Sequence, residues 1–230
     1  MMLKAIGISK RFFRASGASN TFEAVCPTDF ELPEGTLTVL LGRSGSGKTT
    51  LLNLLSGLLS PTQGQVLLGE DDLYAMDDKS LSRFRNAHFG VIPQGHAALN
   101  SLSVLENVTF PARLYDARPD AEGEGERLLG RFGILNLKDV SPSELSGGEL
   151  RRMSIARALI NHPDVVFADE PTGDLDDENT ALVLEALRGI ARDGAAVLLV
   201  THETDALDYA DRAFRMDAGR LTPIELSVSG

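Results

Sequence analysis

Short apolar runs alternate with helical patterns along most of this chain. Strand-length runs occupy residues 3–8, 36–41, 88–92, 164–168 and 195–200, and stretches with helical periodicity separate most of them. Strands that alternate with helices favour parallel pairing in one central sheet. The pattern therefore predicts an α/β fold with a mostly parallel sheet.

This pattern is interrupted near the N-terminus and again in the middle of the chain. Residues 21–25 and 29–32 are short apolar segments among glycines and prolines, which predicts an N-terminal antiparallel β subdomain. Residues 103–160 are helical and more charged, with capping-box patterns at Ser103 and Glu106 and again at Ser146 and Glu149. This middle stretch predicts an inserted α-helical subdomain.

We therefore expect a single domain over residues 1–230. Residues 1–95 and 161–230 would form the core with its β subdomain, and residues 96–160 the helical subdomain.

Charge and cysteine content limit the possible partners. The chain carries 22 Lys and Arg against 33 Asp and Glu, a net charge of −11, so a general basic surface for nucleic acid or anionic lipid is not expected. A single cysteine, Cys26, cannot form an internal disulfide, which fits a reducing compartment. The most apolar stretches are far shorter than the roughly 20 residues that cross a bilayer. We expect a cytoplasmic protein without direct membrane insertion.

A glycine-rich segment supplies a local anion site. It follows the apolar run TLTVLL and precedes the helical run TTLLNLLSGLL, the strand, loop and helix context of a phosphate-binding loop. The glycines allow backbone N–H groups and the helix N-terminus to face phosphate, while the lysine adds a point charge and Thr49 can bind Mg²⁺. Its residues are Gly42, Arg43, Ser44, Gly45, Ser46, Gly47, Lys48 and Thr49, and Thr50 follows.

Two adjacent carboxylates end the apolar run VVFADE. Side chains alternate across a strand, and the carboxyl end of a parallel strand lies at the ligand-binding edge of its sheet. We assign Asp169 to Mg²⁺, directly or through a water, and Glu170 to polarising the attacking water.

A second exposed helix N-terminus is predicted at Ser146, Gly147, Gly148 and Glu149. Alone it is a well-capped helix. Together with the upstream phosphate loop and the downstream carboxylates, the chain resembles the ATP-binding cassette (ABC) ATPase family over nearly its whole length. The segment at Gly42–Thr49 resembles Walker A, LSGGE the signature and VVFADE Walker B, while Gln94, residues 173–176 and His202 resemble the Q-loop, D-loop and switch histidine.

This resemblance implies the family fold and an ATP and Mg²⁺ site shared by two head-to-tail cassettes. Walker A of one subunit would face the signature of a second copy or a homologous cassette. Gln94 would sense the metal and water, His202 would contact the γ-phosphate, and Asp176 would lie at the subunit seam. Phe12 stands near the family's usual base-stacking aromatic, and Phe13 and Phe22 are alternatives.

Several segments, among them FGVIPQ, LSVLENVTFPARLY and VFADEPTGDLD, resemble the branch with lipoprotein-releasing, macrolide-exporter and cell-division cassettes. The implied function is ATP hydrolysis that drives an integral membrane permease subunit, with this chain peripheral on the inner face of the membrane. We expect the partner's cytoplasmic helix to dock near residues 99–115. The alternative is a non-transport regulatory ABC ATPase; a GTPase is disfavoured because N-K-x-D is absent, and a kinase would not explain LSGGE.

Overall fold

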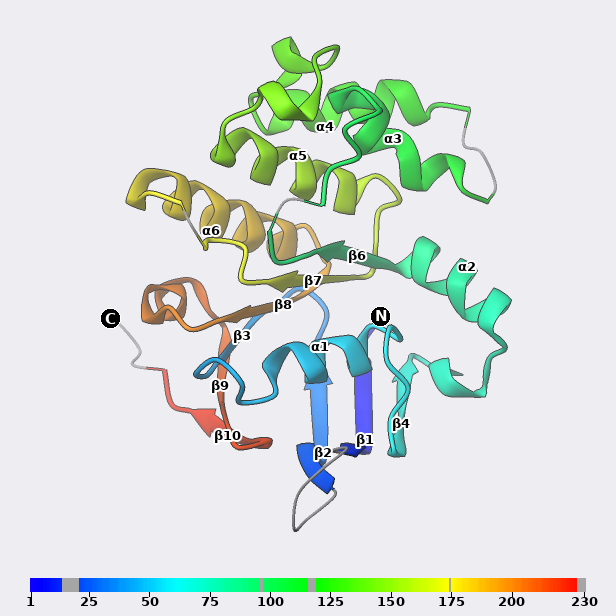
Figure 1. The fold of residues 1–230 in the computed structure, drawn as a ribbon, viewed down its shortest axis with the longest axis vertical. Coiled ribbons are helices and arrows are strands. Elements are labelled where there is room, and N and C mark those ends of the chain that lie inside the picture. The colour runs from blue at the N-terminus through cyan, green and yellow to red at the C-terminus, as the bar shows by residue number, and fades with distance from the viewer. Residues whose placement is uncertain (14–20, 96, 116–118, 174, 227–230) are drawn as a thin grey trace.

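A mostly parallel sheet runs through the centre of the computed structural model, which describes residues 1–13, 21–95, 97–115, 119–173 and 175–226. Within those residues its strand order is β10-β9-β3-β8-β7-β6 (Figure 1). All neighbours pair in parallel except β10, which pairs antiparallel with β9. The strands are β3 (Leu37–Leu41), β6 (Phe89–Ile92), β7 (Val165–Asp169), β8 (Ala196–Thr201), β9 (Arg212–Asp217) and β10 (Arg220–Ile224).

A second sheet is antiparallel and has the order β2-β1-β4-β5 in the described part of the chain. The two short segments expected at 21–25 and 29–32 are one continuous strand, because β2 continues through Pro27 with shifts of register against β1. Its strands are β1 (Leu3–Phe13), β2 (Thr21–Leu32), β4 (Gln63–Leu68) and β5 (Asp71–Asp72). The predicted fold class, a parallel-dominated sheet with an antiparallel β subdomain, is confirmed.

Helices fill the space around the central sheet. The short helix α1 lies between the two sheets, α6 covers the opposite face of the central sheet, and α3, α4 and α5 gather beyond α6 (Figure 1). The α-helices are α1 (Lys48–Leu55), α2 (Asp78–His88), α3 (Val104–Arg113), α4 (Ala121–Arg131), α5 (Gly147–Leu159) and α6 (Asp177–Arg192). Short 3-10 turns are η1 (Leu73–Ala75), η2 (Leu135–Leu137), η3 (Pro142–Glu144) and η4 (Thr204–Tyr209).

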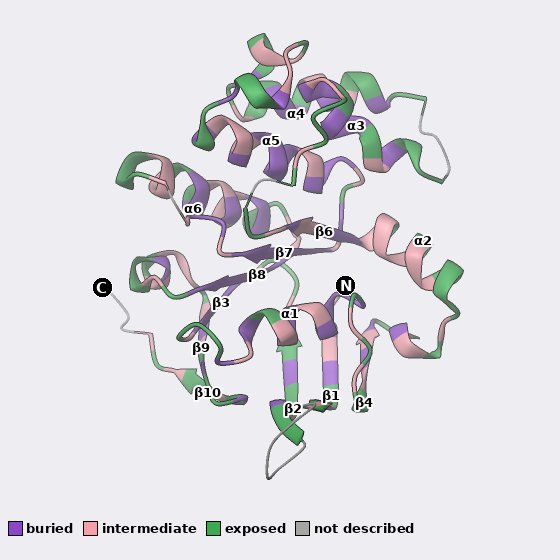
Figure 2. Ribbon diagram, in the orientation of Figure 1, coloured by how far each residue is buried: buried purple, intermediate pink, exposed green. Residues whose placement is uncertain are grey.

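The strand β7 shows how the central sheet is buried on both faces (Figure 2). Val165 and Phe167 belong to the apolar core shared with α1 and the antiparallel sheet, whereas Val166 and Ala168 belong to the core shared with α6 and the helical group. This alternation follows from the period of two in a strand. The next residue, Asp169, therefore lies on the α1 side of the sheet.

The carboxyl ends of β3, β6, β7 and β8 meet at one edge of the sheet because these strands run in parallel. The segments that follow them carry the glycine loop, Gln94, Glu170 and His202. Ligands of open parallel sheets bind at this edge. Across the described helices, none has both the length and the apolar character needed to cross a membrane.

Candidate functional site

The glycine loop between β3 and α1 needs glycine for steric reasons. Gly45 and Gly47 have φ angles of +77° and +108°, which side-chain-bearing residues rarely adopt. A Cβ atom on Gly47 would lie 2.2 Å from the carbonyl oxygen of Ala24, and one on Gly42 would lie 2.5 Å from that of Met216. The loop backbone is therefore packed against β2 and β9, with its N–H groups and the start of α1 forming an anion site.

Lys48 provides a buried cation at the base of this loop. Its Nζ donates hydrogen bonds to the carbonyl oxygens of Gly42 at 2.7 Å and Arg43 at 3.2 Å. The same nitrogen lies 3.6 Å from a carboxylate oxygen of Glu170. The ammonium is thus held by two carbonyl oxygens beside one carboxylate at the base of the loop.

Asp169 lies beside the start of α1, as the alternation along β7 requires. The hydroxyl of Thr49 donates to its Oδ1 at 3.3 Å. Burial raises the pKa of the Asp169 carboxyl, and the hydrogen bond from Thr49 opposes that shift. A buried carboxylate next to a hydroxyl is a pair of oxygen ligands that suits Mg²⁺.

No cluster of three or more His, Cys, Asp and Glu suited to a metal ion occurs among the described residues. Mg²⁺ is commonly held by one or two carboxylates together with substrate phosphates and water. The donor set at Thr49 and Asp169 is of this kind.

Glu170 is held by contacts from β8 and from His202, which follows that strand. Its φ angle is +46°, in the left-handed region, and its N–H donates to the carbonyl oxygen of Val200 at 2.8 Å. Its Oε2 lies 2.9 Å from Nδ1 of His202. The Glu170 side chain is 13% exposed and that of His202 is 63% exposed, so the pair joins a mostly buried carboxylate to a ring open to solvent. Non-glycine residues in this backbone region are enriched at functional sites.

Most of these groups line one cleft of about 1240 Å³. Of the sequence-predicted residues, it brings together Phe12, Arg43, Ser44, Gly45, Ser46, Gly47, Lys48, Thr49, Thr50, Gln94, Glu170 and His202. Gly42 and Asp169 are not on its wall but contact Lys48 and Thr49, which are. The cleft thus joins the loop, the Glu170–His202 pair and one aromatic wall.

The aromatic wall consists of Phe12 and Phe22, whose rings stack with centroids 5.6 Å apart at 27°. Both residues line the cleft, whereas Phe13 is 83% exposed and is not among the lining residues. Alternation along β1 turns Phe12 and Phe13 to opposite faces. Of the three candidates for base stacking, the geometry favours Phe12 backed by Phe22.

The cleft also contains residues that sequence reasoning missed. Glu203 follows His202 and accepts a hydrogen bond from Thr172 at 2.5 Å. Gly219, in the turn between β9 and β10, donates its N–H to the carbonyl oxygen of Ser46 at 2.9 Å. Arg151 on α5 donates to the carbonyl oxygen of Pro93 at 3.0 Å, next to Gln94. No sequence motif marks these residues, because they reach the cleft only through the packing of segments that are far apart in sequence.

The signature residues lie outside this cleft. Ser146 caps α5 through a reciprocal box in which its N–H donates to the Glu149 carboxylate at 2.8 Å and its hydroxyl accepts from the Glu149 N–H at 3.4 Å. Ser146 and Gly147 are exposed. The lining of the cleft includes none of Ser146, Gly147, Gly148, Glu149 and Asp176. Asp174, part of the D-loop interpretation, and His96, the start of the expected helical subdomain, lie outside the described residues.

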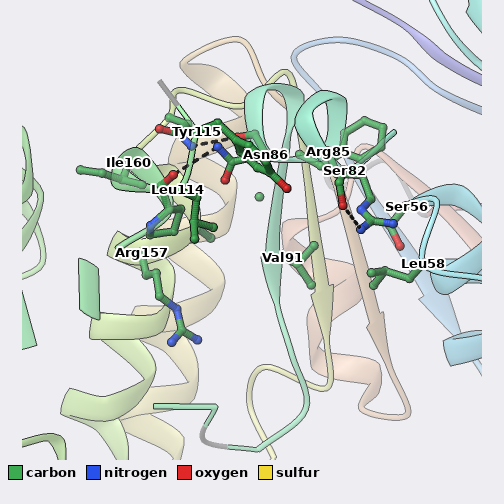
Figure 3. A pocket seen from close by; sticks show the side chains of 15 residues that line it. Ser56, Leu58, Ser82, Arg85, Asn86, Val91, Leu114, Tyr115, Arg157 and Ile160 are labelled. Carbon is green, nitrogen blue, oxygen red and sulfur yellow. Dashed lines mark hydrogen bonds between the residues drawn. The ribbon is translucent and has the colours of Figure 1, made fainter. Parts of the chain in front are cut away.

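A second hollow, of about 300 Å³, lies between α2, β6, α3 and α5 (Figure 3). Arg157 stands on one wall and Arg85 on the other, with Val91 between them. Their guanidinium groups donate to the carbonyl oxygens of Ala97 at 2.6 Å and Gly57 at 2.7 Å. No Asp or Glu is among its described lining residues, so the hollow is cationic in an acidic protein.

Several known proteins are similar to this chain. A profile of the family described as ABC transporter matches residues 26–173. The chain is 37% identical to the lipoprotein-releasing system ATP-binding protein LolD of Chromohalobacter salexigens, covering 96% of this chain and 93% of the relative. It is 36% identical to the ABC transporter ATP-binding protein YtrE of Bacillus subtilis over 89% of this chain and 90% of the relative.

Two further matches concern domain context and fold. The chain is 36% identical to the macrolide export ATP-binding/permease protein MacB 2 of Aeromonas hydrophila, covering 96% of this chain but 34% of that longer protein. The solved dimeric post-hydrolysis structure of the ATP-binding cassette MJ0796, bound to ADP and Pi, superposes with a TM-score of 0.85. That likeness has 27% identity and covers 97% of this chain and 99% of the other.

Proposed function

This chain belongs to the ABC transporter family as an ATP-binding subunit, and we propose that it binds ATP with Mg²⁺ in the cleft around Lys48 and hydrolyses it to ADP and phosphate to drive a membrane partner. The observation that carries the proposal is the shared cleft of the glycine loop, Lys48 and the Glu170–His202 pair. Relatives named as ATP-binding proteins of LolD, YtrE and MacB type support it.

We assign the triphosphate to the glycine loop. Its backbone N–H groups and Lys48 would hold the β- and γ-phosphates, and the base would stack on Phe12. The hydroxyl of Ser46 is buried without a hydrogen-bond partner among the described residues, as expected of a group that a ligand completes. The full set is Gly42, Arg43, Ser44, Gly45, Ser46, Gly47, Lys48, Thr49 and Thr50.

We assign Mg²⁺ to Thr49, Asp169 and Gln94. When bound, the ion would neutralise charge on the β- and γ-phosphates. The hydrogen bond from Thr49 to Asp169 keeps both oxygens on the same side of β7, next to the start of α1. Gln94, which is exposed at the cleft wall, would orient the metal-bound phosphate and the attacking water.

Glu170 would act as the general base. Its carboxylate would accept a proton from the water that attacks the γ-phosphorus, and ADP would leave with the β-phosphate oxygen. His202, 2.9 Å from Oε2, would hold this carboxylate in place and contact the γ-phosphate. General-base assistance of this kind contributes about 10²- to 10⁴-fold to a rate.

The signature surface completes the site in a dimer. Ser146, Gly147, Gly148, Glu149 and Asp176 do not line the cleft of their own chain, while the first N–H groups of α5 have no intrahelical partner. We infer that these N–H groups face the γ-phosphate held by a second copy or a homologous cassette. The helix dipole and the bound nucleotide would then offset repulsion between two acidic chains.

The cationic hollow between α2 and α5 is our candidate for docking of an integral membrane permease subunit (Figure 3). Leu58, Leu114 and Tyr115 are exposed apolar residues on its rim. Arg157 faces the hollow and binds Ala97, close to Gln94. A partner helix with apolar anchors and an acidic end fits this surface, and it would place the chain peripherally on the inner face of the membrane.

The enzymatic part is tested with Glu170→Gln. We expect phosphate release to fall at least about 100-fold, while ATP still binds and traps a dimer in light scattering. Glu203→Gln is the matched control, because Glu203 lines the same cleft but is bonded to Thr172. A wild-type hydrolysis rate in Glu170→Gln would remove Glu170 from the mechanism.

The partner is tested by purifying Glu170→Gln from its native membranes in detergent with ATP and Mg²⁺. We expect an integral membrane protein to copurify, and a Leu58→Glu substitution to release it. Leu182→Glu is the control, because Leu182 is comparably exposed, 47% against 53%, but lies on α6 away from the hollow. Recovery of soluble proteins or nucleic acid alone would instead favour a regulatory ATPase.

A further inference from the structure

Asn179, in the first turn of α6, makes contacts with both of the seam-facing motifs. Its Nδ2 donates to Oδ1 and Oδ2 of Asp176 at 2.9 and 3.1 Å, and its backbone N–H donates to Oδ1 at 2.8 Å. Its Oδ1 accepts a hydrogen bond from Arg152 of α5 at 3.2 Å. The amide orientation is determined by chemistry, because a carboxylate only accepts and a guanidinium only donates.

The same side chain explains why Gly148 carries no side chain. A Cβ atom on Gly148 would lie 2.4 Å from Oδ1 of Asn179, and one on Gly147 would lie 3.9 Å from a methyl group of Leu175. The first turn of α5 therefore packs directly against the residues that open α6. The N-terminal ends of these two helices lie on the same side of the molecule (Figure 1).

We infer that Asn179 is a positioning residue that joins the signature turn of α5 and the Asp176 side chain into one rigid surface. Both motifs face the second cassette in the proposed function, on which this inference rests. The signature turn and Asp176 must keep fixed positions relative to each other in the dimer, because each of them would contact the partner cassette at a separate point. Loss of the Asn179 contacts would therefore weaken ATP-driven dimerisation without changing how the isolated chain binds ATP at the distant glycine loop.

Asn179→Asp is the sharpest substitution because it keeps the shape that packs on Gly148 and the acceptor for Arg152. It replaces the donor to Asp176 with a second carboxylate at a distance of about 3 Å, where like charges repel and raise one pKa of the pair. The charged groups close to this pair are Arg152 and Glu149 on α5 and Asp177 and Glu178 on α6. Once protonated, the introduced carboxyl group would again donate to Asp176.

The experiment measures dimer dissociation constants with ATP in the Glu170→Gln background at pH 8 and pH 6, alongside ATP affinity of the monomer. We expect both Asn179→Ala and Asn179→Asp to raise the dimer dissociation constant at least tenfold and to change monomer affinity less than twofold. For Asn179→Asp the defect should shrink at pH 6, which loss of packing would not produce. Asn136→Asp, an exposed site on η2, controls for the added charge.

The outcomes separate the inference from the proposed function. If Glu170→Gln with native Asn179 does not dimerise with ATP, the proposed function fails. If it does, and the Asn179 variants dimerise equally well, the positioning role is wrong. A defect in Asn179→Asp that is identical at both pH values, or that Asn136→Asp reproduces, also overturns the inference.

Discussion

Replacing Lys48 with methionine removes the ammonium from the nucleotide cleft and keeps most of the aliphatic stem. Within the chain, Nζ is bonded to the carbonyl oxygens of Gly42 and Arg43 and lies 3.6 Å from Glu170. The ammonium therefore already has two hydrogen-bond acceptors and a nearby carboxylate within the protein itself. A phosphate oxygen must replace at least one of these partners, so its net gain is smaller than a full charge interaction.

The expected loss follows from this exchange. Two unit charges at 4 Å attract by about 4 kcal/mol at an effective dielectric constant of 20, and a hydrogen bond to a charged group contributes about 1.5–3 kcal/mol net. Because one existing contact is given up, we expect a loss of about 2–3 kcal/mol. This corresponds to ATP affinity about 30- to 150-fold lower.

Titration calorimetry with ATP, ADP and AMP measures this loss. The decrease should be largest for ATP, smaller for ADP and absent for AMP, since Lys48 is assigned to the β- and γ-phosphates. Lys4→Met is the control, because Lys4 is a partly exposed lysine paired with Glu31 on the antiparallel sheet and its removal changes net charge equally. ATP affinity within twofold of wild type, or an equal loss for AMP, would refute the assignment of Lys48 to the phosphates.

Two further predictions concern the walls of the same cleft. Phe12→Ala should lower ATP affinity by about 1–3 kcal/mol, the usual contribution of a stacked base, and leave inorganic triphosphate binding unchanged in calorimetry. Phe13→Ala should change the affinity for neither ligand. An equal loss of ATP affinity in both variants would contradict the stacking assignment. Gly47→Ala should lower the free energy of unfolding in urea by more than Gly194→Ala. Both glycines have positive φ, which costs about 1–3 kcal/mol for other residues, but only at Gly47 would the Cβ atom collide with backbone; equal losses would contradict this.

Local chemistry made much of the site predictable from sequence. The side chains of the run before Asp169 alternate between two buried faces of the sheet. A strand that is buried on both faces is apolar along its length, so the first charged residues mark its end. The glycines before Lys48 predict a backbone that phosphate could approach closely, because side chains at those positions would obstruct it. The glycine loop, the two carboxylates and the capped start of α5 could each be recognised from a short segment of sequence, because each depends on residues that are close together in the chain.

Longer-range features were not predictable in this way. Strands β4, β9 and β10 carry no periodicity strong enough to name them in advance, and the two segments expected before Leu32 are one strand because pairing with β1 continues past Pro27. Sheet partners decide such strands, since β propensity reflects packing against neighbours more than the local chain.

Short segments of the chain determine which residues are candidates for the chemistry, because phosphate binding, metal binding and proton transfer each demand particular side chains at short spacings. The neighbours of those residues depend on how the whole chain packs. The turn at Gly219 supports Ser46 across the sheet, Glu203 turns toward Thr172, and Asn179 occupies the space that Gly148 leaves open. These contacts join segments that are far apart in sequence. Local propensity does not specify them, because the segments come together only when the core packs.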